Sequence, residues 1–120
     1  MMEKSNVFQV RTAKSPHATT VFLQGELDLS KVSELRSALD PYIADTSRDL
    51  VLNLKDLQYI DSTGIGVIVS VLKARDVLKA HFLVEDIPPK IKRIFDLTGI
   101  TPFLQQSPPA DSSGARIING

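Results

Sequence analysis

Three consecutive polar side chains, Asp61, Ser62 and Thr63, are the best candidates for chemistry in this sequence. They follow a β-compatible run and precede an apolar segment that begins at Gly64. This order places the three residues at the N-terminus of a helix, where Asp and Ser side chains satisfy backbone N–H groups that lack a helical acceptor. Because three polar side chains compete for one capping role, we expect at least one hydroxyl to face solvent.

Other catalytic or ligand-binding patterns are weak. His17 and His81 have no ligand-like spacing to another histidine or a carboxylate, and no histidine lies near Ser62 in the sequence. There is no cysteine, which excludes disulfides and thiolate chemistry. Gly64 and Gly66 form a lone Gly-x-Gly without a phosphate-binding lysine, so we expect them to serve close packing at a helix start. We predict no enzymatic activity, no metal and no cofactor.

The bulk composition narrows the class of protein. The 120 residues suffice for one domain, and 14 basic residues balance 14 acidic ones. A neutral chain without a basic cluster is a poor candidate for binding nucleic acid or an anionic membrane surface. The longest apolar stretch, residues 65–72, is far shorter than the ~20 residues that span a bilayer. With no signal-peptide profile at the N-terminus, these features predict a cytoplasmic protein.

The elements that position the polar triplet can be predicted from patterning. Residues 7–13 and 19–23 read as two strands of a hairpin. A helix capped by Ser30 follows, and Pro41 is expected to kink it or end it early. Residues 50–54 form a central strand, with residues 56–61 as the loop that leaves it.

The second half of the chain repeats the alternation of helix and strand. Residues 64–79 read as a helix whose apolar first half packs more deeply than its charged second half. A strand at 82–84, a helix between Pro88 and Gly99, and a possible short strand at 100–104 follow. Successive β-α-β units imply a mostly parallel sheet with an antiparallel edge. The low hydrophobicity of residues 107–120 predicts a disordered tail after a domain of residues 1–106.

Four segments together resemble one family. Residues 61–67 (Asp-Ser-Thr-Gly-Ile-Gly-Val) are similar to the signature of the anti-sigma factor antagonists, which are single STAS domains. Residues 25–28, 51–54 and 92–100 resemble, in order, the loop before the family's first helix, its central strand, and its third helix with its exit. The resemblance implies the STAS-type fold, an α/β fold with a mixed four- to five-stranded sheet and helices packed mainly on one face.

The resemblance also implies a function. The unphosphorylated antagonist binds an anti-sigma factor that is a serine kinase, and thereby releases a sigma factor. Phosphorylation of the residue matching Ser62 ends the binding, and a serine phosphatase restores it. Many relatives carry Ser where this chain has Thr63, which makes Thr63 a second candidate acceptor. Many relatives also end in an extra helix, whereas the tail here is Pro-rich.

The partner surface can be predicted from the expected topology. Binding sites of α/β folds gather at the C-terminal ends of parallel strands. We therefore expect one contiguous partner-binding surface, formed by Asp28, Asp61, Ser62, Thr63 and Gly64. Two other functions remain open: a small STAS subunit of a transport or stress-signalling complex, and an enzyme or nucleotide-binding module. Gene neighbours would separate the antagonist from the complex subunit, and a nucleotide titration would test the third possibility.

Overall fold

The computed structural model describes residues 7–104, so the predicted tail of residues 107–120 and the domain boundary at 106 lie outside the described residues. In chain order, the elements are β1 (Gln9–Lys14), β2 (Ala18–Leu27), the 3-10 helix η1 (Leu29–Lys31), α1 (Val32–Ile43), β3 (Asp49–Ile60), α2 (Ser62–Val77), β4 (Phe82–Glu85), α3 (Pro89–Thr98) and the 3-10 helix η2 (Thr101–Phe103).

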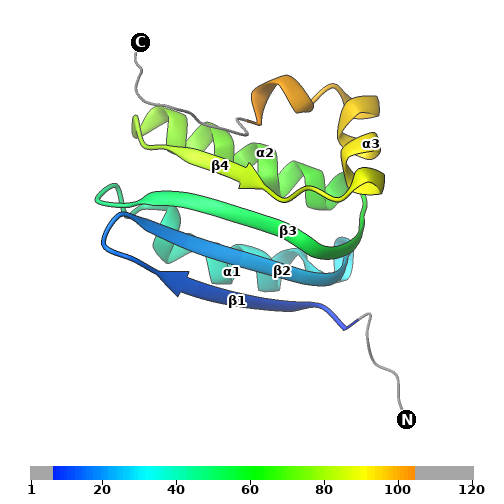
Figure 1. Cartoon of the computed structure of the whole chain (residues 1–120), viewed down its shortest axis with the longest axis horizontal. Coiled ribbons are helices and arrows are strands. Elements are labelled where there is room, and N and C mark those ends of the chain that lie inside the picture. The colour runs from blue at the N-terminus through cyan, green and yellow to red at the C-terminus, as the bar shows by residue number, and fades with distance from the viewer. Residues whose placement is uncertain (1–6, 105–120) are drawn as a thin grey trace.

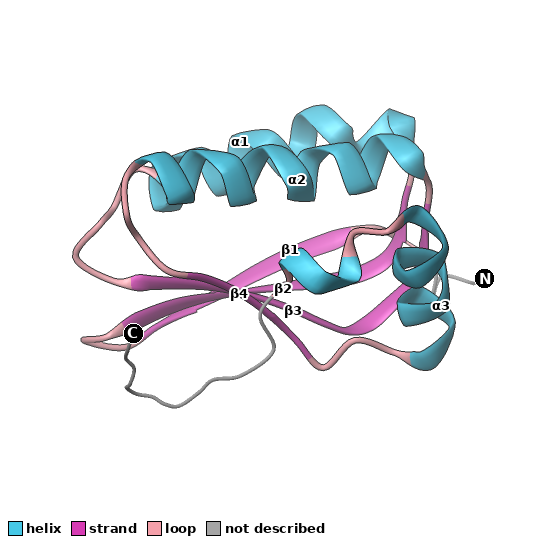
Figure 2. Cartoon of the chain, turned by 90° about the horizontal axis from the view of Figure 1, so that it is seen from above, coloured by secondary structure: helices cyan, strands magenta, loops and turns pink. Residues whose placement is uncertain are grey.

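The strands form one four-stranded mixed sheet. Its order is β1-β2-β3-β4. The β1–β2 pair is antiparallel, and the β2–β3 and β3–β4 pairs are parallel. Helices α1 and α2 lie side by side over one face, while α3 lies beyond the end of the sheet where β3 and β4 finish (Figures 1 and 2). The predicted α/β class and the one-sided helix layer are confirmed.

The core lies between the sheet and the two long helices. Along β2 every second residue from Thr19 to Leu27 is buried, as expected for a strand with one covered face. In β3, residues 50–54 are all buried, as expected for a central strand, and beyond them only Leu57 and Ile60 are buried. The fully buried aliphatic side chains of this layer include Val21, Leu23, Leu27, Leu35, Leu39, Leu50, Leu52, Leu54, Ile68 and Val71.

The strands are longer than patterning predicted. Residues 56–60, expected to be a loop, belong to β3, and β2 continues to Leu27. The pairing of these two strands has register shifts between Phe22 and Gln24 and between Gly25 and Glu26. A bulge changes which face successive side chains occupy, so the period-2 pattern disappears from the sequence although the strand continues.

Three local predictions need correction. Ser30 does not cap the first helix, because Asp28 caps η1 and α1 begins only at Val32. Of the kink or early break expected at Pro41, the early break does not occur, since α1 continues to Ile43. Residues 101–103 form η2 instead of a last strand, so within residues 7–104 the sheet ends at β4.

The charged second half of α2 hides a buried cation. Arg75 is fully buried, contrary to the expectation that this half is the more exposed. Within residues 7–104, no side-chain carboxylate accepts from its guanidinium. Instead it donates to the backbone carbonyl oxygens of Tyr42, Ile43, Asp45, Arg48 and His81. One side chain thus joins the end of α1 to the regions just before β3 and β4.

Candidate functional site

The polar triplet lies where two parallel strands end together. Leu27 and Ile60, the last residues of β2 and β3, are paired in register, and the Asp61 amide donates to the Leu27 carbonyl oxygen at 3.2 Å. Asp28 and Asp61 therefore leave the sheet next to each other. The negative charge of Asp61 acts on the Asp28 carboxyl and opposes its ionisation. The predicted juxtaposition of these two aspartates follows from the register.

Asp61 is the N-cap of α2. Its extended backbone (φ −106°, ψ −176°) aims Oδ1 at the first turn, where it accepts from the amides of Thr63 at 3.0 Å and Gly64 at 3.1 Å. The Thr63 hydroxyl is the main cause that holds the pKa of Asp61 below its ordinary value, with further help from backbone amides that include that of Leu29. The carboxylate is thus ionised at neutral pH and joins the loop after β2 to the start of α2.

The two hydroxyls of the triplet have different roles. The Thr63 hydroxyl donates to Asp61 Oδ1 at 2.5 Å and its side chain is half-buried. Ser62 is the first residue of α2, is exposed, and its hydroxyl forms no hydrogen bond with any of residues 7–104. One hydroxyl therefore serves the cap and the other is available to a partner, as the competition for one capping role suggested.

The two glycines of the motif differ. A Cβ on Gly64 would lie 2.8 Å from Ile60 Cγ1 and 2.9 Å from Leu27 Cγ, so this position requires glycine for the close approach of helix and sheet. Gly66 is exposed, and a Cβ there would meet no heavy atom within 4 Å. The expectation of close packing is confirmed at Gly64 and is wrong at Gly66, because α2 turns Gly66 away from the sheet.

Asp28 repeats the Asp61 arrangement on a smaller scale. Its Oδ1 accepts from the Ser30 amide at 3.0 Å and the Ser30 hydroxyl at 2.6 Å, and the Lys31 ammonium lies 3.8 Å away. The Ser30 hydroxyl is the main cause that lowers the pKa of Asp28. The loop therefore presents a second ionised carboxylate next to Asp61, with the Lys31 ammonium beside it.

No histidine is placed to activate Ser62. The backbone carbonyls of His17 and His81 accept from the amides of Asp49 and Leu50, at the beginning of β3. Ser62 follows the other end of that strand, roughly 35 Å away at ~3.3 Å per residue. In residues 7–104, no group of three or more His, Cys, Asp or Glu side chains could hold a metal ion. Within residues 7–104, Ser62 thus has neither a histidine nor a metal-binding cluster beside it.

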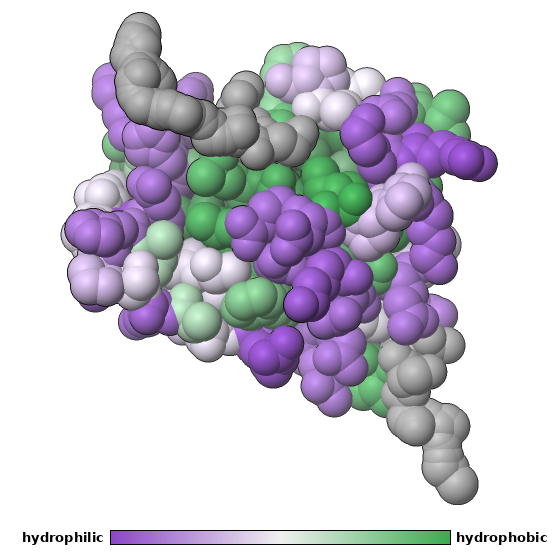
Figure 3. All heavy atoms as spheres, in the orientation of Figure 1, coloured by the Kyte–Doolittle hydropathy of each residue, from purple (hydrophilic) through white to green (hydrophobic). Residues whose placement is uncertain are grey.

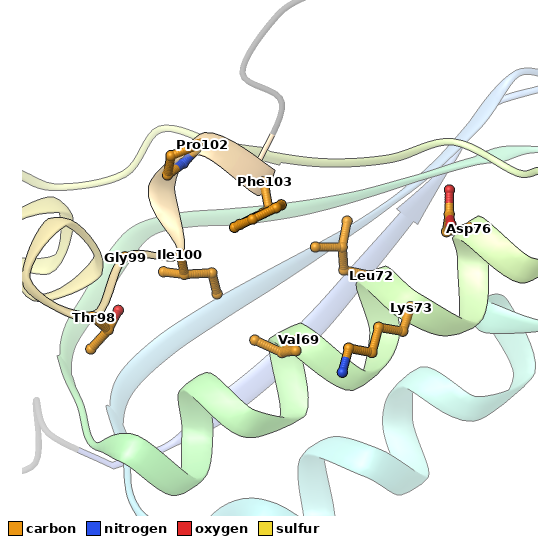
Figure 4. Close-up of a pocket in the computed structure, with 9 residues that line it drawn as sticks. All are labelled: Val69, Leu72, Lys73, Asp76, Thr98, Gly99, Ile100, Pro102 and Phe103. Atoms are coloured by element: carbon orange, nitrogen blue, oxygen red, sulfur yellow. The ribbon is translucent and has the colours of Figure 1, made fainter.

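A separate apolar groove of about 660 Å³ lies between α2 and the segment that follows α3 (Figure 4). Hydrophobic residues gather on this part of the surface, between β4 and η2 (Figure 3). Val69 and Leu72 face Ile100 and Phe103 across the groove, and Lys73 and Asp76 lie along its α2 side. No segment of residues 7–104 occupies this groove.

Three surface residues near the triplet were not anticipated. Leu29 is 70% exposed and Tyr59 is 46% exposed, although both are large and apolar. Gly66 is the third. The residue types alone do not indicate that Leu29 and Tyr59 are exposed. For Tyr59, alternation along a regular β3 could place the side chain on either face of the sheet. The signal for Gly66 was its place inside a helical run, where glycine has no local benefit.

In residues 7–104, no helix is long and apolar enough to cross a membrane. The STAS domain profile matches residues 9–115. The anti-sigma-B factor antagonist of Staphylococcus aureus (strain NCTC 8325 / PS 47) is 38% identical over 76 residues, which is 63% of this chain and 70% of that protein.

Solved structures agree on the fold. Unphosphorylated SpoIIAA, an anti-sigma factor antagonist, superposes with a TM-score of 0.68 at 19% identity, over 85% of this chain and 89% of the other. The phosphorylated form of SpoIIAA, a Bacillus cell fate determinant, superposes with a TM-score of 0.63 at 19% identity, over 85% and 92%. The profile match, the relative and the shared fold point to one family. The chain belongs to the STAS domain family.

Proposed function

We propose that this protein is an anti-sigma factor antagonist. In its unphosphorylated form it binds an anti-sigma factor that is a serine kinase, and so releases a sigma factor. Phosphorylation of Ser62 by that kinase ends the binding, and a serine phosphatase reverses it in the cytoplasm. The observation that carries the proposal is the exposed Ser62 hydroxyl at the start of α2, which forms no hydrogen bond within residues 7–104, beside a Thr63 hydroxyl that is bound to Asp61.

Names of similar proteins support this proposal. The Staphylococcus aureus relative is named for antagonism of an anti-sigma-B factor. SpoIIAA has been solved in an unphosphorylated and a phosphorylated form, so a protein of this fold carries a phosphate. Residues 61–67 have the signature expected of the modified segment, and Ser62 is its first hydroxyl.

The electrostatics of the site explain how a phosphate would act. It adds roughly −1.5 to −2 charges at pH 7, beside the ionised Asp61 and near Asp28. The amides of Thr63 and Gly64 already donate to Asp61, so the helix cap does not depend on the phosphate and the fold should persist. A partner would have to desolvate the added charge. A hundredfold loss of affinity needs only about 2.7 kcal/mol, which a buried, unmatched phosphate can supply.

The partner surface proposed here comprises Asp28, Asp61, Ser62, Thr63 and Gly64. Asp28 and Asp61 contribute negative charge, and Ser62 carries the hydroxyl that is phosphorylated. The half-buried side chain of Thr63 contributes part of the surface contour that the partner contacts. Gly64 is buried, so its contribution is to hold α2 close to the sheet.

The experiment mixes the protein with each anti-sigma kinase of the same cell and ATP, and locates the phosphate by mass spectrometry. Ser62→Ala should abolish most labelling, and Thr63→Ala should leave Ser62 labelled. Ser62→Asp should weaken binding to the kinase while the circular dichroism spectrum stays unchanged. Strong labelling of the Ser62→Ala protein would refute the assignment of the acceptor. Wild-type protein that neither binds nor is labelled by any of the kinases would refute the function.

A further inference from the structure

The packing of this domain does not explain why residue 66 is a glycine. Gly66 lies in the second turn of α2, exposed, and apart from the adjoining backbone of its own helix no heavy atom of residues 7–104 lies within 4 Å of the position that a Cβ would occupy. Glycine inside a helix is destabilising relative to alanine, because its backbone loses more freedom on folding. Gly64, two residues earlier, has a steric reason to be glycine. The isolated protein would therefore be more stable with alanine at position 66.

Gly66 lies on the same side of α2 as the proposed switch. Residues four apart on a helix are neighbours on one face, so Gly66 is adjacent to Ser62. Both are exposed. Helical spacing continues this strip to Val69 and Lys73, which line the groove shown in Figure 4. One turn after Ser62, α2 therefore exposes its backbone at Gly66, where no side chain covers it.

We propose that Gly66 is a contact point for the anti-sigma factor, at which the partner's chain lies directly against the α2 backbone while it covers Ser62. The inference rests on the proposed function and names the footprint of that same partner. Glycine is the residue that permits such close approach of a backbone to a ligand. Any side chain at position 66 would hold the partner away from α2 and from the Ser62 hydroxyl.

The test compares Gly66→Ala and Gly66→Leu with the wild type, using the anti-sigma kinase that binds the wild type. Gly66→Ala should raise the melting temperature by about 4 °C, as expected for a helix-favouring change in a domain of this size. It should nevertheless weaken binding severalfold. Gly66→Leu should weaken binding tenfold or more, which corresponds to about 1.4 kcal/mol. Higher stability combined with lower affinity is the result that a merely structural glycine would not give.

Asp76→Ala is the matched control. Asp76 is exposed on α2, and alanine raises helix propensity there without altering the surface next to Ser62. It should bind as the wild type does. If Asp76→Ala weakened binding as much as Gly66→Ala, helix stiffness would be the cause and the inference would be wrong. If Ser62→Asp weakened binding but Gly66→Leu did not, the inference would fail while the proposed function stood. If no anti-sigma kinase bound the wild type, both would fall.

Discussion

Replacing Arg75 with methionine should destabilise this domain strongly. The guanidinium is fully buried and its Nη1 donates to the carbonyl oxygens of Tyr42, Ile43 and Asp45, at 3.3, 3.1 and 2.9 Å. Its Nη2 donates to the Arg48 carbonyl oxygen at 2.7 Å. Burial lowers the pKa of Arg75, but the guanidinium stays charged because arginine titrates far above neutral pH.

The magnitude follows from the carbonyl oxygens that would lose their donor. Tyr42 also accepts from the Asp45 amide, and His81 from the Leu50 amide, so each of these keeps a partner. Outside the helices and the sheet, no backbone amide of residues 7–104 donates to the carbonyl oxygens of Ile43, Asp45 and Arg48. At about 1 kcal/mol or more for each buried acceptor left unpaired, the loss is about 3 kcal/mol. That is a large share of the ~5–15 kcal/mol that stabilises a typical domain.

Urea unfolding followed by circular dichroism measures this loss. With a slope of about 1.5 kcal/mol per molar urea, the midpoint should fall by about 2 M. Arg36→Met is the matched control, because Arg36 is exposed and, within the described part of the chain, donates to the Ser70 hydroxyl alone, so its effect should stay within about 0.5 kcal/mol. A loss below about 1 kcal/mol for Arg75→Met would refute the reasoning, since it would mean that these carbonyl oxygens do not depend on the guanidinium.

The remaining predictions concern the site and the tail. Gly64→Ala should lower the free energy of unfolding by about 1–3 kcal/mol, because its Cβ would crowd two buried side chains, and an unchanged urea midpoint would contradict this. The pKa of Asp61 is lowered in the folded state, so its contribution to stability is complete above about pH 4 and is lost as pH falls through that lower value. The difference in urea midpoint between wild type and Asp61→Asn should therefore shrink from pH 7 to pH 2.5, and a difference independent of pH would count against it. A chain ending at Gln106 should bind its partner with unchanged affinity, and a melting temperature many degrees lower would show that residues 107–120 pack on the domain.

The sequence alone was sufficient for the order of the four strands and three α-helices, and for a capped helix start at residues 61–63. Hydrophobic periodicity located α2 and α3, and Gly99 was correctly predicted as the stop of the latter, where its φ of 79° suits glycine. The Asp-Ser-Thr order indicated a capped helix start with a spare hydroxyl. These features depend on neighbours within one or two turns, so local composition determines them.

Only the tertiary structure decided which hydroxyl is free and which glycine is packed. Ser62 and Thr63 are chemically alike, and the direction of the first turn of α2 assigns one to Asp61 and the other to solvent. Gly64 and Gly66 differ because one faces the sheet and the other does not. The pairing of Leu27 with Ile60 brought Asp28 beside Asp61, and it depends on a register shift that the sequence pattern conceals. Arg75 appeared to belong to a solvated face, because the carbonyl oxygens that bind it come from segments about 30 residues away in the chain. Such contacts arise only when distant segments meet, so no local pattern could reveal them.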